Sequence, residues 1–171
     1  GISSKMSKKY TTTILSTTNV NISPHDLIGD INKMILLNLK KRYEGVCNKD
    51  GFIVKDSIQL TNRSLGQIKT INNHSFINYN VTYSADIIYP SVGSIYDSIV
   101  QTKNKVGIIS YIQINEGDTM ENSPYIIITP KEYMSEEVFD TLNVNEKITI
   151  KVKSFRIKYM AKQIQIVAEL V

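Results

Sequence analysis

Cysteine occurs once in this sequence, at Cys47, and histidine occurs twice, at His25 and His74. A single thiol excludes an internal disulfide and a cysteine cluster for a metal ion. The chain also has no Gly-x-Ser-x-Gly motif, no phosphate-binding loop and no His-x-x-x-His pair. Cys47 lies in a predicted strand, where a packed thiol is expected. The sequence therefore predicts no catalytic residue, no metal site, no cofactor and no small-molecule substrate.

Long hydrophobic runs are also missing. No apolar stretch approaches the roughly 20 residues that span a bilayer, so we expect no membrane partner. The first residues are rich in lysine and threonine and lack the apolar segment of a secretion signal. These features predict an intracellular protein.

Charge of both signs is present in nearly equal amounts, with 20 basic and 16 acidic side chains. Residues 1–89 carry 11 basic and 6 acidic side chains, whereas residues 90–171 carry 9 and 10. In the second half the basic residues gather late in the chain. This distribution is compatible with a nucleic-acid partner without requiring one.

The first half is expected to contain one helix and several strands. Residues 10–18 are rich in threonine and predict a strand, followed by a turn at 19–23. Ser23 is the predicted N-cap of a helix that ends at the basic run 40–42, with Pro24 in its first turn. Its apolar residues recur at helical spacing and predict packing against a sheet: Leu27, Ile28, Ile31, Met34, Ile35 and Leu39.

β structure is expected after this helix. Residues 48–51, Asn-Lys-Asp-Gly, predict a hairpin turn between strands at 43–47 and 52–60. A loop follows over 61–73, broken by Gly66 and containing a possible short strand at 67–71. A long strand is expected at 75–89, before Pro90.

The second half predicts five strands and one short helical turn. The strands are expected at 92–102, 105–114, 124–129, 147–158 and 162–170, and the helical turn within 130–140. Five short strands with glycines at bends are typical of a small OB-type barrel. The predicted fold class is α+β, with a strand–helix–antiparallel-sheet domain at 6–89 and an all-β OB-fold barrel at 90–171.

Two segments resemble the stalk subunits of multi-subunit RNA polymerases, namely the seventh subunit of eukaryotic RNA polymerase II and its archaeal counterpart. Residues 43–54, YEGVCNKDGFIV, resemble the hairpin of that family. Residues 81–85, VTYSA, then 92–100 and the Val-Gly pair at 106–107 resemble its entry into the OB fold. The composition, rich in isoleucine and asparagine, suggests a divergent version such as those of large DNA viruses.

The resemblance implies a non-catalytic subunit of a DNA-directed RNA polymerase that works in transcription. The N-terminal domain would be a tip that docks near the clamp of the polymerase core, with a second stalk subunit as a further partner. The expected location is the nucleus of a cell, or the host cytoplasm or virion for a virus. The docking candidates are Asn48, Asp50, Gly51, Phe52, Leu65 and Gly66.

The OB domain would meet nascent single-stranded RNA, because such domains combine a basic groove with aromatic stacking platforms. The RNA-binding candidates are Lys103, Lys105, Tyr111, Lys151, Lys153, Arg156 and Lys158. RNA-binding relatives carry an aromatic two residues after the glycine matched by Gly107, where this chain has Ile109. We therefore expect weak, electrostatic and salt-sensitive binding. The alternatives are a solvated strand face for the lysines and simple packing for Tyr111.

Two other classes of protein remain open. The first is a free-standing OB-fold RNA-binding protein, such as a translation or RNA-processing factor. A small enzyme is the least favoured class, since no active-site constellation is visible. A stalk tip should present an apolar surface to a large partner, whereas a free-standing binder should present its positive surface to RNA.

Overall fold

The computed structural model describes residues 10–171, which divide into two compact units. The sheet unit contains residues 12–45 and 53–87, and the barrel unit contains residues 10–11, 46–52 and 88–171. The division at residue 88 lies close to the predicted boundary, but a hairpin from the first half of the chain joins the barrel unit.

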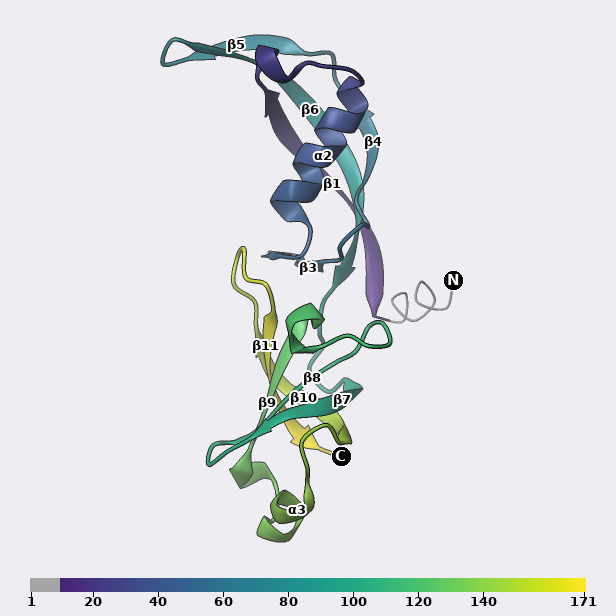
Figure 1. Cartoon of the computed structure of the whole chain (residues 1–171), viewed down its shortest axis with the longest axis vertical. Helices are drawn as coiled ribbons and strands as arrows, with labels where there is room; N and C mark the ends of the chain where they lie inside the picture. Colours follow the sequence, from purple (N-terminus) through teal and green to yellow (C-terminus); the bar gives the residue numbers. More distant parts are fainter. Residues whose placement is uncertain (1–9) are drawn as a thin grey trace. The chain divides into compact units, whose positions relative to one another are not determined.

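The sheet unit is built on the long strand β6 (His74–Ile88). The hydrogen-bonded order of the six-stranded sheet is β1-β6-β3-β2, with β1 at Thr11–Ile22, β3 at Gly51–Ile53 and β2 at Cys47–Asn48. The β2–β3 hairpin is the part of this sheet that residues 46–52 contribute to the barrel unit. Strands β4 (Gln59–Arg63) and β5 (Gln67–Ile71) also pair with β6, both antiparallel (Figure 1). The predicted short strand at 67–71 is confirmed as β5.

Helix α2 (Ile31–Tyr43) begins later than the sequence predicted. Ser23 instead caps a short 3-10 helix, η1, at Pro24–Asp26. Gly29 then adopts a φ of 89°, and the Asp30 side chain accepts a hydrogen bond from the Asn32 N–H at 2.9 Å. A left-handed glycine followed by an aspartate cap restarts the helix here. Ile28, predicted to belong to the apolar stripe, lies outside the helix and is 82% exposed.

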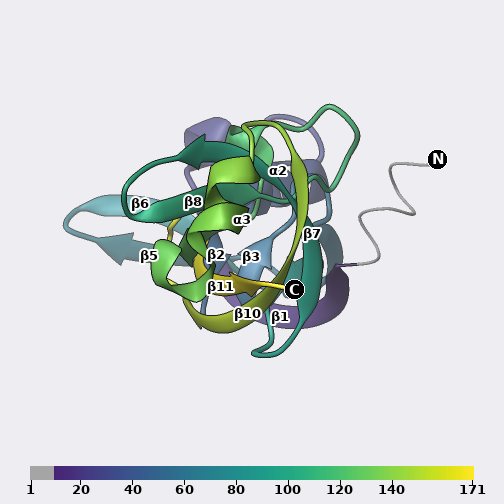
Figure 2. The same ribbon diagram turned by 90° about the horizontal axis from the view of Figure 1, so that it is seen from below.

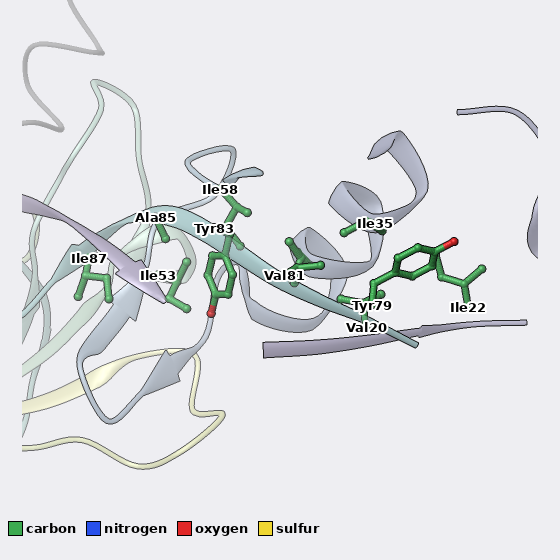
Figure 3. Packing of buried hydrophobic residues seen from close by; sticks show 11 residues of the cluster. Val20, Ile22, Ile35, Ile53, Ile58, Tyr79, Val81, Tyr83, Ala85 and Ile87 are labelled. Atoms are coloured by element: carbon green, nitrogen blue, oxygen red, sulfur yellow. The ribbon is translucent and has the colours of Figure 1, made fainter. Parts of the chain in front are cut away.

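The core of the sheet unit lies between α2 and the inner face of the sheet (Figure 3). Ile35 and Leu39 of α2 are completely buried, as the stripe predicted. They share a cluster with alternate residues of β6, namely Tyr79, Val81, Tyr83, Ala85 and Ile87. Burying each aliphatic side chain contributes about 1.5–3 kcal/mol, so this contact accounts for the helix packing.

Three predicted strand limits in this unit are wrong. β1 continues through the predicted turn at 19–23, because Val20 and Ile22 reach the core. The predicted strand at 43–47 overlaps the last turn of α2, and only Cys47 belongs to β2. The predicted strand at 52–60 is divided into β3 and β4 by a turn in which Asp56 has a φ of 61°.

The barrel unit contains a closed five-stranded barrel. Its strands are β7 (Ile95–Lys103), β8 (Gly107–Tyr111), β9 (Tyr125–Pro130), β10 (Lys147–Arg156) and β11 (Ile164–Leu170). The closed order is β10-β11-β9-β8-β7, and only the pairing of β11 with β9 is parallel. This connectivity is OB-like, so the predicted mixed fold with a small barrel is confirmed at that level.

Isoleucines fill the barrel: Ile108, Ile127, Ile150, Ile164 and Ile166 are each fully buried. Helix α3 (Glu136–Thr141) lies at one end of the barrel, the end nearest the viewer in Figure 2, and buries Phe139. The helical turn predicted within 130–140 is thus present, preceded by the 3-10 turn η3 at Lys131–Tyr133.

Gly107 is required where β8 begins. Its φ is 150°, and a Cβ at this position would collide with the backbone carbonyl oxygen of Thr129 on β9. Only glycine combines this backbone conformation with so close an approach of two strands. The glycine singled out in the sequence therefore has a structural reason that is independent of any ligand.

Candidate RNA-binding and docking surfaces

Groups of metal-ligating side chains were sought in residues 10–171. The described residues bring no group of three or more histidine, cysteine, aspartate or glutamate side chains into an arrangement that suits a metal ion. Within the same residues, no helix has the length and apolarity needed to cross a bilayer. The sequence-predicted residues lie in the strands and loops of the barrel and of the sheet.

Lys103, a predicted RNA contact, is occupied within the protein. Its Nζ donates a hydrogen bond to the Leu142 carbonyl at 3.2 Å and lies 4.6 Å from the centre of the Phe139 ring. Lys131 contacts the same ring at 4.8 Å. These cation–π contacts hold α3 at the end of the barrel. Of the two candidates Lys103 and Lys105, only Lys105 is exposed, in the β7–β8 turn, and it stays an RNA-binding candidate.

The outer face of β10 is less positive than its lysines suggest. Lys151 and Lys153 are both exposed, as alternation predicted. However, Glu169 of β11 lies directly opposite Lys151 in the ladder, and its carboxylate is 3.7 Å from Lys153 Nζ. Lys147 similarly pairs with Asp97 at 3.6 Å. The outer face of β10 therefore carries charges of both signs. This favours the alternative that its lysines are simply solvated and bind no RNA.

A β-bulge changes the direction of the side chains at the end of β10. The register with β11 shifts between Val152 and Ser154, so that Phe155 opposes the buried Ile166 and Arg156 opposes the exposed Gln165. Strict alternation from Val152 would have turned Arg156 inward. The bulge therefore places Arg156 on the exposed surface, followed in the loop by Lys158.

The aromatic candidate proposed from sequence does not lie at the surface. Tyr111 is only 7% exposed, so its ring packs in the barrel unit and offers no stacking platform. By contrast, Tyr159 in the β10–β11 loop is 74% exposed. From the sequence, Tyr159 fell between the predicted strands at 147–158 and 162–170 and was not singled out. The signal that could have identified it is an aromatic residue with Lys158 before it and Lys162 after it in a loop.

We call residues 156–162 the basic loop. Its cations are Arg156, Lys158 and Lys162, and no acidic residue occurs between 147 and 168. Its backbone is held by the Met160 N–H, which donates to the Cys47 carbonyl at 2.8 Å, and by Ala161, whose carbonyl accepts from the Cys47 N–H at 2.8 Å. The loop therefore presents an exposed aromatic ring among three cations on a fixed backbone.

The predicted docking hairpin at 46–52 is mostly committed to its own chain. Phe52 is 9% exposed, and Gly51 is buried in β3. Asn48 uses its side-chain oxygen to accept the Asp50 N–H at 2.7 Å, which fixes the predicted turn. Of these candidates only Asp50 is fully exposed. Cys47 is buried as predicted, and burial raises the pKa of its thiol to about 11.

The other docking candidates, Leu65 and Gly66, lie where a hairpin leaves the sheet. Leu65 is 85% exposed, whereas Gly66 packs so tightly against Ile77 and Tyr79 that a Cβ would come within 2.6 Å of the Ile77 side chain. Ile68 and Ile71 of β5 are 80% and 58% exposed. We call residues 65–77 the β5–β6 arm. From the sequence, Ile68 and Ile71 fell in a possible short strand at 67–71 within a loop, and neither was predicted to be a docking residue.

A shallow polar groove of about 270 Å³ crosses the outer face of the sheet. It is lined by Thr17, Asn62, Arg63, Ser64, Asn80 and Thr82. Arg63 directs its guanidinium to Asn32 Oδ1 at 2.6 Å and to the Ser64 carbonyl at 3.1 Å. Arg63, the one charged residue among these six, is thereby engaged within the chain, and the lining contains no carboxylate, histidine or cysteine.

Comparison with models of known protein families gives no match, and a search of curated protein sequences gives no relative. The functional assignment therefore depends on the fold and on the two surfaces, the basic loop and the β5–β6 arm.

Proposed function

We propose that this chain is a non-catalytic stalk subunit of a multi-subunit DNA-dependent RNA polymerase, docked through its sheet unit and contacting nascent RNA through its barrel. The single observation that carries the proposal is the combination, in one short chain, of an OB-like barrel with a separate sheet–helix unit. The sequence resemblance in residues 43–54 and 81–108 points in the same direction.

The β5–β6 arm supports docking on a large protein partner. Every residue of β5 is exposed, and its turn at Asn72 and Asn73 has positive φ values of 50° and 66°. Two positive φ values in a two-residue turn give a tight, defined hairpin. Leu65, Ile68 and Ile71 supply exposed apolar side chains along this arm, which a docked protein partner would bury. The docking element is therefore the arm, more than the hairpin at 46–52.

The basic loop supports contact with single-stranded RNA. OB folds use the loop between their fourth and fifth strands for oligonucleotides, and in this barrel that loop joins β10 to β11. Tyr159 supplies a ring on which a base can stack, and the neighbouring cations attract phosphates. With few cations, affinity is expected to be modest and to fall as salt is raised.

A free-standing OB-fold RNA-binding protein is the alternative function. The same basic loop favours it, because RNA binding by the barrel requires no polymerase. The arm is the feature that this alternative leaves unexplained.

Affinity purification distinguishes the two functions. The full-length chain is tagged in the cells, or infected cells, that normally express it, and copurifying proteins are identified by mass spectrometry. We expect the two large polymerase subunits at near-equal amounts with the chain, after nuclease treatment, and a second stalk subunit where one exists. Recovery of RNA or ribosomes alone would contradict the stalk assignment and support the free-standing binder.

A further inference from the structure

Strand β1 forms an open edge of the sheet unit. In the hydrogen-bonded order of the described strands it is terminal, with β6 as its neighbour. Two side-chain bonds give its register: the Thr13 hydroxyl donates to Asp86 at 2.7 Å, and Asn78 donates to Asn21 at 2.6 Å. Both pairs fit one antiparallel alignment of β1 with β6. The alignment therefore does not shift between residues 13 and 21 of β1.

The register identifies which backbone groups face the open edge. The Asn80 N–H bonds to Ser64 Oγ, and the Asn80 carbonyl accepts from the Ser64 N–H. Asn80 therefore directs its backbone away from β1, and its register partner Asn19 directs its own away from β6. Consistent with this, the Asn19 carbonyl accepts a hydrogen bond from the Arg42 guanidinium at 2.9 Å. Because backbone groups alternate along a strand, Thr13, Leu15 and Thr17 also present N–H and C=O groups to the open edge.

This edge lacks the features that normally prevent strands from pairing. Natural edge strands carry lysine, proline or a bulge, or are very short. β1 has 12 residues, TTTILSTTNVNI, with no charged residue and no proline. Most of these residues, threonine, isoleucine, leucine and valine, favour extended structure. The edge is thus open to addition of another strand.

Leu15 marks the centre of the open segment. It is 67% exposed, on the face opposite the buried residues Val20 and Ile22. It is the one large apolar side chain among the odd-numbered residues that face the edge. An exposed leucine leaves apolar surface in contact with water. An identical leucine placed opposite would remove part of that surface from water.

We propose that β1 pairs antiparallel with β1 of a second copy of this chain, about a two-fold axis at Leu15. In this register Leu15 opposes Leu15 of the second copy, and Thr13 opposes Thr17. The strand is self-complementary, because the absence of charge means that no like charges oppose each other. Arg42 already occupies the Asn19 carbonyl, so the new ladder is limited to residues 13–17 and the dimer is weak.

The dimer is tested by sedimentation velocity on the full-length chain between about 5 µM and about 500 µM, since a small interface binds weakly. We expect the average sedimentation coefficient of the wild-type chain to rise toward that of a dimer. Leu15→Lys should raise the dissociation constant of the dimer at least about tenfold, because two ammonium groups would meet at the two-fold axis.

Leu37→Lys is the matched control. Leu37 is also 67% exposed and lies on α2 of the same unit, on the side of the helix opposite the buried residues Ile35 and Leu39. We expect this variant to dimerise as the wild type does. Thermal unfolding of both variants checks that neither change disturbs the fold.

A charge-swap experiment tests the register itself. Leu15→Lys and Leu15→Glu should each remain monomeric alone and should form a heterodimer when mixed at equal concentrations. A wild-type chain that stays monomeric at the highest concentration overturns the proposal. So does a Leu15→Lys variant that dimerises as well as the wild type. The proposal does not rest on the stalk assignment, because these measurements use the free chain.

Discussion

At the residue scale, the barrel interior contains hydroxyl groups with opposite roles. Thr129 is fully buried, and its hydroxyl has no hydrogen-bond partner among the described residues. Ser123 is equally buried, but its hydroxyl accepts the N–H groups of Ile112 and Tyr125 at 3.2 and 3.1 Å and donates to the Tyr125 carbonyl at 2.6 Å. An unsatisfied buried hydroxyl costs stability, whereas a satisfied one connects the loop before β9 to the barrel.

Replacing these hydroxyls should therefore change stability in opposite directions. Thr129→Val removes an unpaired polar group with little change of shape, and should raise the free energy of unfolding by about 1 kcal/mol. Ser123→Ala leaves two N–H groups without their acceptor, and should lower it by about 1–3 kcal/mol. Urea unfolding of both variants measures the difference. Equal effects of the same sign would contradict this account of the barrel interior.

Cys47 should make the protein sensitive to alkaline pH. Burial raises its pKa from 9.0 to about 11, so the folded state keeps a proton that the unfolded state loses. Stability from this group is complete below pH 9.0 and is lost as pH rises to about 11. Wild type should lose up to about 2–3 kcal/mol more than Cys47→Ala between those limits.

The comparison between the two proteins is necessary because burial also raises the pKa of Tyr125, which acts in the same direction at high pH. Chemical unfolding at about pH 8 and about pH 10.5 gives the difference. Identical pH dependence in the two proteins would show that the thiol is not protected from solvent.

At the scale of secondary-structure elements, local signals predicted which elements exist better than where they begin. The Asp-Gly turn at 50–51, the apolar stripe of α2 and the short strand β5 are present as predicted. The helix start was wrong because Ser23 and Pro24 satisfy capping rules for a 3-10 turn as well as for an α-helix. Asp30 after Gly29 is also a local N-cap signal, and capping rules alone do not rank it against Ser23.

The outward direction of Arg156 also depends on a tertiary feature. The bulge in β10 follows from pairing with β11, which a period-two pattern in one strand cannot show. The same limit explains Tyr111, which the sequence could place in a strand but not on its inner or outer face. The sequence does show an aromatic residue, Tyr159, between Lys158 and Lys162, but it does not show that the ring is exposed.

The β5–β6 arm gives the prediction at this scale. Changing Leu65 and Ile68 together to Ser should reduce recovery of polymerase subunits about tenfold, because the variant loses the burial of two aliphatic side chains against the partner. Stability should change by less than about 0.5 kcal/mol, since both side chains face solvent. The control changes Val92 and Val106, each 67% exposed in the barrel unit, to Ser. Equal recovery with both double variants would exclude the arm as the docking element.

At the scale of the whole molecule, the chain combines one unit that carries the β5–β6 arm and one unit that carries the basic loop. Net charge does not indicate which unit would bind RNA. The positive excess lies in residues 1–89, whereas the cations around the exposed ring of Tyr159 lie at 156–162. Lys147 and Lys153 form ion pairs with Asp97 and Glu169, so we leave these two lysines out of the proposed RNA contacts.

RNA binding should therefore depend on the basic loop and little on the middle of β10. Changing Arg156, Lys158, Tyr159 and Lys162 to Ala should reduce affinity for labelled oligouridylate about tenfold at low salt. It should also reduce the slope of log affinity against log salt by about 2, the value for three cations on a single strand. Changing Lys151 and Lys153 to Ala should have a smaller effect. Fluorescence anisotropy at several salt concentrations measures both, and the reverse order of effects would refute the assignment.

The stalk assignment is tested most directly by cross-linking mass spectrometry on the complex that copurifies with the full-length chain. Lys69 of β5 and Lys33 of α2 are exposed lysines of the sheet unit, and Lys158 and Lys162 are exposed lysines of the basic loop. The account predicts cross-links from Lys69 to a large polymerase subunit, with the basic-loop lysines cross-linking instead to RNA under ultraviolet light. A complex that lacks the large polymerase subunits, or that reaches them through the basic loop and not through the sheet unit, would contradict it.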